Sequence, residues 1–446
     1  MLNVNLLTEV KTLFEYIRIK LKDDREIEGL LVKEELIDNK KFLIIKLENG
    51  YNIGINIENI VKKEIYKRKI EKTDKRNNKR SNIKEPIREN KNLIAILHTG
   101  GTIASRVDYE TNAVKSLFTP EEILERFPEI KNYANIITFL VSNIFSEDIN
   151  FNIYNKLIDK IRELSNRSIK GIIITHGTDT MHYTSAALKF AIPNVKFPIV
   201  LVGSQRSADR PSTDALVNLV CAIKFIVKAN LPGVFVCMHG SINDDFCYIF
   251  DGFNVRKMHT SRRDAFKQIN NLPIAKVFYE EDKIEFLRNT TNNNSYFKKE
   301  NKWYKFNPRL KIGILYVHPN MHPKEIKCYE DFDGLIIAGT GLGHFPVNTF
   351  NEIDNSYLYN ELKQLIKKGV IIGIAPQTIN GRINLNVYST GRRLKELGIL
   401  GNLCDMTIET AFIKLAFLLS NFDKKKVKEL YEKNIAGEIN ERSIYL

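Results

Sequence analysis

The stretch LIAILHTGGTIAS, Leu93–Ser105, decides the fold. Five consecutive apolar residues are followed by a polar pair and two glycines, a pattern typical of a strand buried on both faces that ends in a sharp turn. Paired glycines allow such a turn and let the backbone approach a ligand closely. Open α/β sheets bind their ligands at the carboxyl ends of strands, so we expect this turn to border a site. Taken alone, however, a Gly-Gly turn is more often an ordinary turn between a strand and a helix.

Similar apolar runs recur along the rest of the chain, and most are separated by helical patterns such as Ser212 to Val227. Strands that are buried on both faces and alternate with helices predict an α/β fold with a largely parallel, doubly wound sheet. The runs are Gly171 to Ile174, Ile199 to Val202, Val234 to Val236, Ile312 to Val317, Gly334 to Ile337 and Val370 to Ile374.

The front of the chain has a different character. Short segments between Phe14 and Tyr66 alternate apolar and polar residues and are separated by turns, which predicts a small β-barrel of the SH3-like type over residues 1–66. Residues 67–91 are highly charged and nearly free of apolar side chains, so they are predicted to be a linker. A solvated tether is the preferred interpretation of this linker over an RNA-binding arm.

Two α/β domains are expected after the linker, over residues 92–290 and 311–446. The polar, asparagine-rich stretch between Glu281 and Asn307 interrupts the alternation of strands and helices, and we interpret it as a surface excursion. The helical tail from Thr407 to Lys433 has apolar spacing suited to packing, and we assign it no chemistry.

Composition narrows the class of protein. The chain has 446 residues, 43% hydrophobic and 27% charged, and lacks an apolar run of the roughly 20 residues that span a bilayer. Its N-terminus does not resemble a secretory signal, so we expect a cytoplasmic protein without membrane contact. Five scattered cysteines without a CxxC pair argue against disulfides and a zinc site, and we expect no metal. The net charge of +14 permits a polyanionic partner but does not demonstrate one.

Two further segments carry candidate chemistry. In the first, THGTDT (Thr175–Thr180), Thr178 and Asp179 follow a predicted strand and precede a predicted helix. A single Thr or Asp there is usually a helix cap, but three threonines with an Asp and a His exceed what a cap needs. In the second, Lys257 lies in a polar stretch where a lysine is ordinarily a solvated charge. Buried among neighbours, it could instead lose its proton and act as a base.

Together, TGGTIAS, THGTDT and RKMHTS resemble the signatures of the bacterial-type L-asparaginase and glutaminase family, in the family's order. The resemblance implies two domains with doubly wound parallel sheets. It also implies that Thr102 attacks a side-chain amide and forms an acyl-enzyme with release of ammonia. Thr178, Asp179 and Lys257 would activate the hydroxyl, with Lys257 taking the proton and Asp179 offsetting its charge. Which threonine attacks first stays open.

The family resemblance also implies residues that bind the substrate. The loop Val141 to Asp148 (VSNIFSED) is similar to the family's loop for the substrate's amino and carboxyl groups, which points to Ser146 and Glu147. Gly101 and Gly177 would line the substrate site, with amides of the Gly100–Gly101 turn as oxyanion donors.

Three further parts of the sequence have expected roles near the site or in the fold. Tyr109 is a candidate for the family's activating tyrosine, or an ordinary loop aromatic. Gly203 to Ala215 is expected to form mainly a turn and a helix start. Gly339 to His344 is where residues could complete a neighbouring chain's site, unless it is only a tight turn.

The predicted barrel, the tether and three further motifs together resemble the archaeal family of glutamyl-tRNA(Gln) amidotransferase D subunits. The motifs are GSQRSADRPSTDA from Gly203, MHGSINDD from Met238 and GTGLGHFP from Gly339. The resemblance implies release of ammonia from glutamine or asparagine for an amidotransferase partner subunit (GatE-like), which converts Glu-tRNA(Gln) to Gln-tRNA(Gln). It also implies a homodimer within a heterotetramer.

The chain itself has no phosphate-binding glycine loop, so we expect no cofactor in it, and ATP and Mg on the partner. Two alternatives remain open. One is a stand-alone cytoplasmic L-asparaginase, and the other is a non-catalytic RNA-binding scaffold.

Overall fold

The computed structural model describes residues 14–37, 40–47, 52–68, 92–101, 103, 105–108, 113–116, 126–208, 212–289, 296, 302–350 and 352–445. The chain separates into two compact units. The first comprises Met1–Pro86 and Val107–Ala113, and the second comprises Ile87–Arg106 and Val114–Leu446. Each unit has a hydrophobic core of its own.

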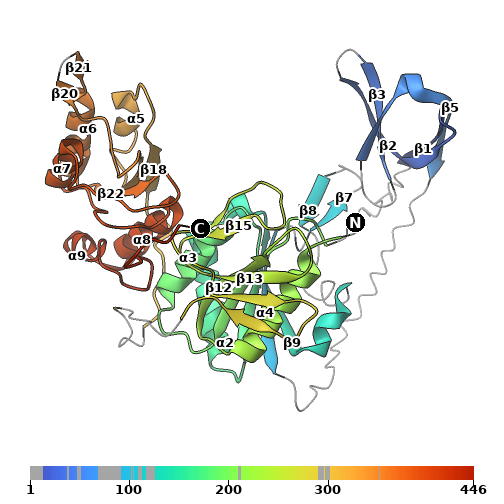
Figure 1. Cartoon of the computed structure of the whole chain (residues 1–446), viewed down its shortest axis with the longest axis horizontal. Helices are drawn as coiled ribbons and strands as arrows, with labels where there is room; N and C mark the ends of the chain where they lie inside the picture. The colour runs from blue at the N-terminus through green and yellow to red at the C-terminus, as the bar shows by residue number, and fades with distance from the viewer. Residues whose placement is uncertain are drawn as a thin grey trace, which may run out of the picture. The chain divides into compact units, whose positions relative to one another are not determined.

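The first unit contains a five-stranded antiparallel sheet with the order β4-β3-β2-β1-β5 (Figure 1). Alternating apolar residues such as Ile17, Ile19, Leu43 and Ile45 face one small core, as period-two patterning requires. Pairing irregularities in β1 and β2 increase the bend of the sheet. The predicted small antiparallel module is therefore confirmed. Its elements are β1 (Phe14–Leu21), β2 (Glu26–Ile37), β3 (Lys40–Lys46), β4 (Asn52–Asn56), the 3-10 helix η1 (Ile57–Asn59) and β5 (Ile60–Arg68).

The second unit is built around an eight-stranded sheet with the order β17-β16-β13-β12-β11-β10-β6-β9. The strands from β9 to β12 in this order are parallel, whereas β13, β16 and β17 are added antiparallel at one edge. The expectation of a largely parallel sheet thus holds for five strands. The strands are β6 (Leu93–Gly100), β9 (Asn135–Ile144), β10 (Gly171–Thr175), β11 (Pro198–Val202), β12 (Gly233–His239), β13 (Phe246–Asp251), β16 (Ala275–Phe278) and β17 (Ile284–Phe286).

Helices cover both faces of this sheet, which explains the continuous apolar runs. Along β6, Ala95 and Leu97 pack in one core with α2 (Phe151–Ser165) and α3 (Met181–Ala191), while Ile94 and Ile96 pack in another with α4 (Ala215–Ala229). Because successive strand residues face opposite sides, a strand covered on both sides must be apolar at every position.

A three-stranded parallel sheet, with the order β18-β19-β22, follows in the C-terminal half. Helix α8 contacts both α3 and β19, so the two halves of this unit share one continuous core. The elements are β18 (Ile312–Tyr316), α5 (Pro323–Lys327), β19 (Gly334–Gly339), α6 (Ser356–Lys367), β22 (Ile371–Pro376), α7 (Ser389–Glu396), α8 (Ile408–Asn421) and α9 (Lys424–Leu430).

Short elements complete the second unit. The hairpin of β14 (Val255–Lys257) and β15 (Phe266–Gln268) follows β13. The others are β7 (Ser105–Asp108), which runs on into the first unit, β8 (Ala113–Ser116), β20 (Thr349–Phe350), β21 (Ile353–Asp354) and the 3-10 helices η3 (Pro128–Asn132) and η4 (Ser146–Asp148). None of the helices in the described part of the chain has the length and hydropathy needed to cross a membrane.

The expected surface excursion between Glu281 and Asn307 holds for residues 281–289, most of which are exposed, but is wrong for Tyr304 and Phe306. Residues of β17 form the edge of the large sheet, and Tyr304 and Phe306 are buried. The backbone of Phe306 both donates to and accepts from the side chain of Asn155, at 2.9 and 2.7 Å. Burial of these two aromatic side chains removes a large apolar area from water. This gain holds the segment against the core although its neighbouring residues are polar.

Replacing Phe306 tests this burial. The Phe306→Ala variant should lower the free energy of unfolding by about 3 to 5 kcal/mol, because it leaves a cavity in the core. The matched control is Phe286→Ala, since that ring is half exposed, and its cost should be roughly 0.5 kcal/mol or less. Denaturant titration compares the two. Equal, small costs would show that the segment lies on the surface after all.

Candidate active site

Three polar segments leave the large sheet at the edge formed by the carboxyl ends of its parallel strands. Because β6, β9 and β10 are parallel, their carboxyl ends lie together, and pairing joins His98 to Thr175 and Gly100 to Ile144. The glycine turn after β6, the segment THGTDT after β10 and the 3-10 helix η4 after β9 therefore meet at this edge. The predicted residues Thr102 and Tyr109 lie outside the described residues.

Glycines make the close approach of these segments possible. Gly101 has φ of +78°, and a Cβ there would lie 2.3 Å from the backbone nitrogen of Gly177. A Cβ on Gly177 would lie 2.6 Å from Cβ of Ser146. Both distances are far below a van der Waals contact, so Gly101 lets its loop pack against the backbone of Gly177, and Gly177 makes room for the side chain of Ser146.

One part of the expectation for these glycines needs correction. The amide of Gly101 donates to the carbonyl of Ile144 at 3.1 Å. It is therefore occupied in holding two strand ends together and is not available to an oxyanion. The expected contribution of Gly101 and Gly177 to substrate binding stays a prediction, and what the structure adds is their packing.

Lys257 joins the segment THGTDT from a distant part of the sequence. It ends strand β14, and its Nζ lies 2.7 Å from Oγ1 of Thr178 and 2.7 Å from Oδ1 of Asp179. The lysine side chain is 9% exposed, whereas that of Asp179 is 66% exposed. The structure therefore brings together three of the four predicted catalytic residues, with the ammonium group shielded and its counter-charge facing solvent.

Asp179 is held in its ionised form. Burial is the largest single effect and acts to raise the pKa of its carboxyl, but the hydrogen bond and positive charge of Lys257, together with the hydrogen bond from Ser146, bring this pKa below its usual value. The buried hydroxyl of Ser146 also donates to Asp179, at 3.2 Å. Glu147 is exposed on η4, and no contact joins it to Asp179 or Lys257 within the described ranges.

The sequence analysis missed Gln205, in a segment expected to form only a turn and a helix start. Its Oε1 accepts from Oγ1 of Thr178 at 3.5 Å, while its backbone amide donates to the buried carboxylate of Asp214 at 2.9 and 3.1 Å. A sequence signal existed, because a glutamine directly after a predicted strand end sits where open sheets place their ligands.

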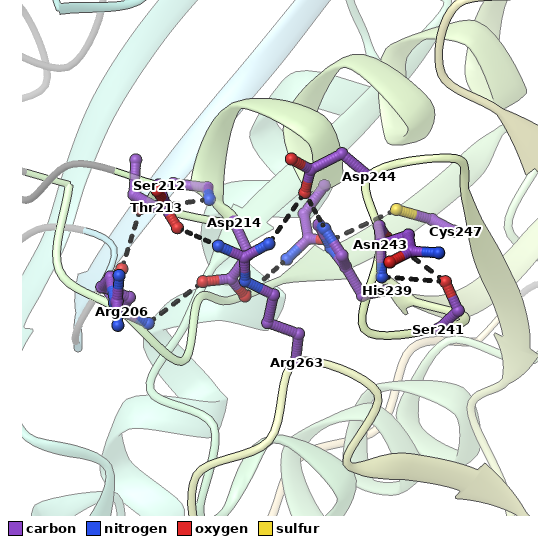
Figure 2. A network of polar contacts seen from close by, with 12 residues as sticks. Arg206, Ser212, Thr213, Asp214, His239, Ser241, Asn243, Asp244, Cys247 and Arg263 are labelled. Atoms are coloured by element: carbon purple, nitrogen blue, oxygen red, sulfur yellow. Dashed lines mark hydrogen bonds and ion pairs between the residues drawn. The ribbon is translucent and has the colours of Figure 1, made fainter.

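A network of polar contacts fixes the loops around Arg206 and Asp214 (Figure 2). The guanidinium of Arg263 donates to Asp244 at 3.0 Å and also donates to the carbonyl of Ser212. Asp244 lies 3.0 Å from the buried ring of His239. Arg263 thus links the loops that follow β11 and β12 to the loop that follows Lys257.

A cavity of about 410 Å³ lies against Asp179 and Lys257. Its lining includes His182 on α3, and burial lowers the pKa of this imidazole to about 4, so it is neutral at pH 7. Glu409 on α8 is also buried and forms an ion pair with Arg256 at 3.1 Å. The sequence analysis assigned no chemistry to the tail that contains Glu409, and the structure places that residue beside the site.

Two other expectations concern loops and metals. Gly339 to His344 forms a tight turn, in which the amide of Thr340 donates to the carbonyl of His344 at 3.1 Å, and its role toward a neighbouring chain stays a prediction. The described ranges contain no group of three or more His, Cys, Asp or Glu side chains suited to a metal ion.

Comparison with known proteins shows the family of the chain. Residues 93–292 match the family "Asparaginase, N-terminal", residues 311–431 match "Glutaminase/Asparaginase C-terminal domain", and residues 12–65 match "GatD N-terminal domain". The chain is 42% identical over 411 residues to the D subunit of the glutamyl-tRNA(Gln) amidotransferase of Methanococcus maripaludis, which covers 90% of this chain and 93% of that one. The chain belongs to the family of glutamyl-tRNA(Gln) amidotransferase D subunits.

Another member of this family and two solved structures are also similar. The D subunit of Pyrococcus furiosus is 41% identical over 434 residues, which covers 95% of this chain and 94% of that one. The thermostable L-asparaginase of Thermococcus kodakarensis superposes with a TM-score of 0.67 at 27% identity, over 78% of this chain and 99% of that one. The probable cytoplasmic L-asparaginase of Campylobacter jejuni gives 0.61 at 27% identity, over 77% and 100%. The expected asparaginase-like fold, preceded by a module typical of D subunits, is therefore confirmed.

The glycine packing can be tested by adding one methyl group. Gly101→Ala should lower the unfolding temperature strongly, because the new Cβ collides with the backbone of Gly177. Gly398→Ala is the matched control, since Gly398 also has positive φ, at +90°, but nothing lies within 4 Å of its Cβ position, and it should cost only about 1 to 2 kcal/mol. Scanning calorimetry of both variants provides the comparison. Equal shifts would contradict the close approach of the two loops.

Proposed function

We propose that this chain releases ammonia from the side-chain amide of glutamine, or of asparagine, for the conversion of Glu-tRNA(Gln) to Gln-tRNA(Gln). The observation that carries the proposal is the position of Lys257 between Thr178 and Asp179, at 2.7 Å from each. It occurs in a chain that shares 41–42% identity with D subunits over at least 90% of its length.

The chemistry starts with a proton transfer. After giving its own proton to solvent, Lys257 takes a proton from a threonine hydroxyl, and the carboxylate of Asp179 offsets the charge that the lysine regains. The threonine oxygen, which we assign to Thr102, attacks the amide carbon to give a tetrahedral intermediate. The lysine then returns the proton to the amide nitrogen, which leaves as ammonia, and the acyl ester remains. Water hydrolyses this ester to the free acid. Thr178 relays the proton, although it could also be the hydroxyl that attacks first.

The remaining predicted residues receive positioning roles in this proposal. Ser146 and Glu147 hold the amino and carboxyl groups of the substrate, and the exposed face of Asp179 contributes to the amine site. Gly101 and Gly177 line the site, and Tyr109 is proposed as the activating tyrosine. A site that holds its substrate at several points gains rate from orientation, because loosely held reactants react far more slowly.

Partners and location complete the proposal. The ammonia goes to an amidotransferase partner subunit, GatE-like, which holds ATP and Mg and binds Glu-tRNA(Gln). The chain acts as a homodimer within a heterotetramer. Its parts are the barrel (1–66), the linker (67–91) and the two α/β domains (92–290 and 311–446). A cytoplasmic location is supported by five free cysteines, four of them buried, because oxidising compartments favour disulfides.

A stand-alone L-asparaginase is the second candidate. It is favoured by the superposition on a solved L-asparaginase over 99% of that chain. The third possibility, a scaffold without activity, has less support, because it leaves the contact of a shielded lysine with both a threonine and an aspartate without a role.

Ammonia release distinguishes these functions. The chain should release ammonia from glutamine only when its partner and Glu-tRNA(Gln) are both present, and Thr102→Ala or Lys257→Met should reduce the rate on the order of 10⁴-fold. Lys267→Met, on the exposed face of the same hairpin, is the control and should keep the wild-type rate. Rapid hydrolysis of asparagine by the isolated chain would support the stand-alone enzyme. Full activity of Lys257→Met would refute the proposed chemistry.

A further inference from the structure

The hairpin that carries Lys257 is flanked by two buried asparagines with left-handed backbones. Asn254 precedes β14 with φ of +53°, and Asn270 follows β15 with φ of +60°. Their side chains are almost inaccessible to solvent. Asparagine tolerates this conformation better than most residues, which explains the residue type but not the burial.

Asn254 is held by the C-terminal half at three points. Its backbone amide donates to Oγ1 of Thr410 at 3.1 Å, and its side-chain Oδ1 accepts from the backbone amide of Thr407 at 3.1 Å. Its Nδ2 donates to the carbonyl of Glu438 at 2.8 Å. Its own carbonyl accepts from the amide of Ile269 at 2.7 Å and so closes the open end of the hairpin.

Asn270 is held in the same way from other parts of the C-terminal half. Its Nδ2 donates to the carbonyls of Asp405 and Gly381, at 2.8 and 3.1 Å, and its Oδ1 accepts from the amide of Gly381 at 2.7 Å. Its carbonyl accepts from the amide of Ile444 at 2.9 Å. Both ends of the hairpin are therefore tied to residues that lie more than 100 positions away in sequence.

The segment that holds Asn254 is itself fixed by buried charge. Glu438 and Lys414 form an ion pair at 2.5 Å with neither side chain exposed. The carboxylate of Glu438 also accepts from the amides of Ile435 and Ala436. Because breaking a buried pair leaves an uncompensated charge, this segment has little freedom to move.

A third tie lies directly beside the lysine. Arg256 forms an ion pair with Glu409 of α8, and Arg256 is the residue before Lys257. The two strands of the hairpin have only three residues each, and an isolated hairpin of this size has marginal stability at best. The position of Lys257 Nζ must therefore depend on contacts outside the hairpin.

We propose that Asn254 and Asn270 are positioning residues for Lys257, through which the C-terminal half places the lysine against Thr178 and Asp179. The inference rests on the proposed function, since it assigns these residues to the same amide hydrolysis. It differs from a general contribution to stability, because it requires the geometry of one ammonium group to change while the fold persists.

The test uses variants that keep the backbone conformation. Asn254→Gly retains access to positive φ and removes the hydrogen bonds of the Asn254 side chain, and Thr410→Val removes the acceptor of the Asn254 backbone amide. The matched control is Asn230→Gly, at an exposed position with φ of +48°. All chains are assayed in full length with partner, tRNA and glutamine.

Both site variants should lower kcat roughly 10-fold to 100-fold, as expected for a displacement near 1 Å, with KM within about twofold of the wild type. Their pH profiles should also change. Lys257 lowers the pKa of Asp179 against the opposing effect of burial, so displacing the lysine raises this pKa. The acid limb of kcat should then move to higher pH, which a smaller folded fraction cannot cause. The control should match the wild type in both measurements.

Acetylation of Lys257 gives a readout that does not depend on activity. The shielded amine should react slowly with acetic anhydride in the wild type and the control, and several-fold faster in both site variants, as followed by peptide mass spectrometry. Unchanged acetylation and an unchanged pH profile in both variants would overturn the inference. An inactive wild type in which the variants still accelerate acetylation would refute the proposed function and leave the positioning supported.

Discussion

The contact of Lys257 with Thr178 and Asp179 is the constraint on which the site depends. Shielding from water favours the neutral form of a lysine amine, and a nearby carboxylate offsets the charge that the amine carries once protonated. Here the amine is shielded while Asp179 stays partly in solvent. Asp179 remains ionised because the lysine, together with the hydrogen bond from Ser146, lowers the pKa of its carboxyl despite burial. The rest of the unit places three parts of the sequence at this one point.

The sheet and the C-terminal half both help to bring these parts of the sequence together. Parallel pairing of β6, β9 and β10 brings the polar loops to one edge, and Gly101 with Gly177 lets them pack within backbone contact. The hairpin that brings the lysine is too short to define its own position, so it relies on buried hydrogen bonds from Asn254 and Asn270 to the C-terminal half. A domain without a proposed catalytic group thus contributes to the geometry of the site.

The sequence predicted the α/β core and the front module, because buried and alternating strands are local patterns. Thr178 and Asp179 were candidates because they follow a predicted strand, whereas Lys257 received its role from the family resemblance. It did not predict the antiparallel edge strands, the burial of Tyr304 and Phe306, or the place of Glu409 beside Arg256. Each of these is a tertiary contact between distant segments. The polar sequence around Tyr304 and Phe306 gave no sign of their burial. The apolar spacing of the helical tail gave no sign that Glu409 lies beside the site. Thr102 and Tyr109, outside the described residues, keep the roles assigned from the family resemblance.

A double-mutant cycle tests most directly whether the lysine and the threonine act as one unit. The rate of ammonia release from glutamine is measured for Lys257→Met, Thr178→Val and the double variant, in the complete complex with tRNA. If the two side chains act together, the double variant should be about as slow as the slower single variant. Losses that multiply would mean that Thr178 and Lys257 contribute independently, and the central claim would be wrong.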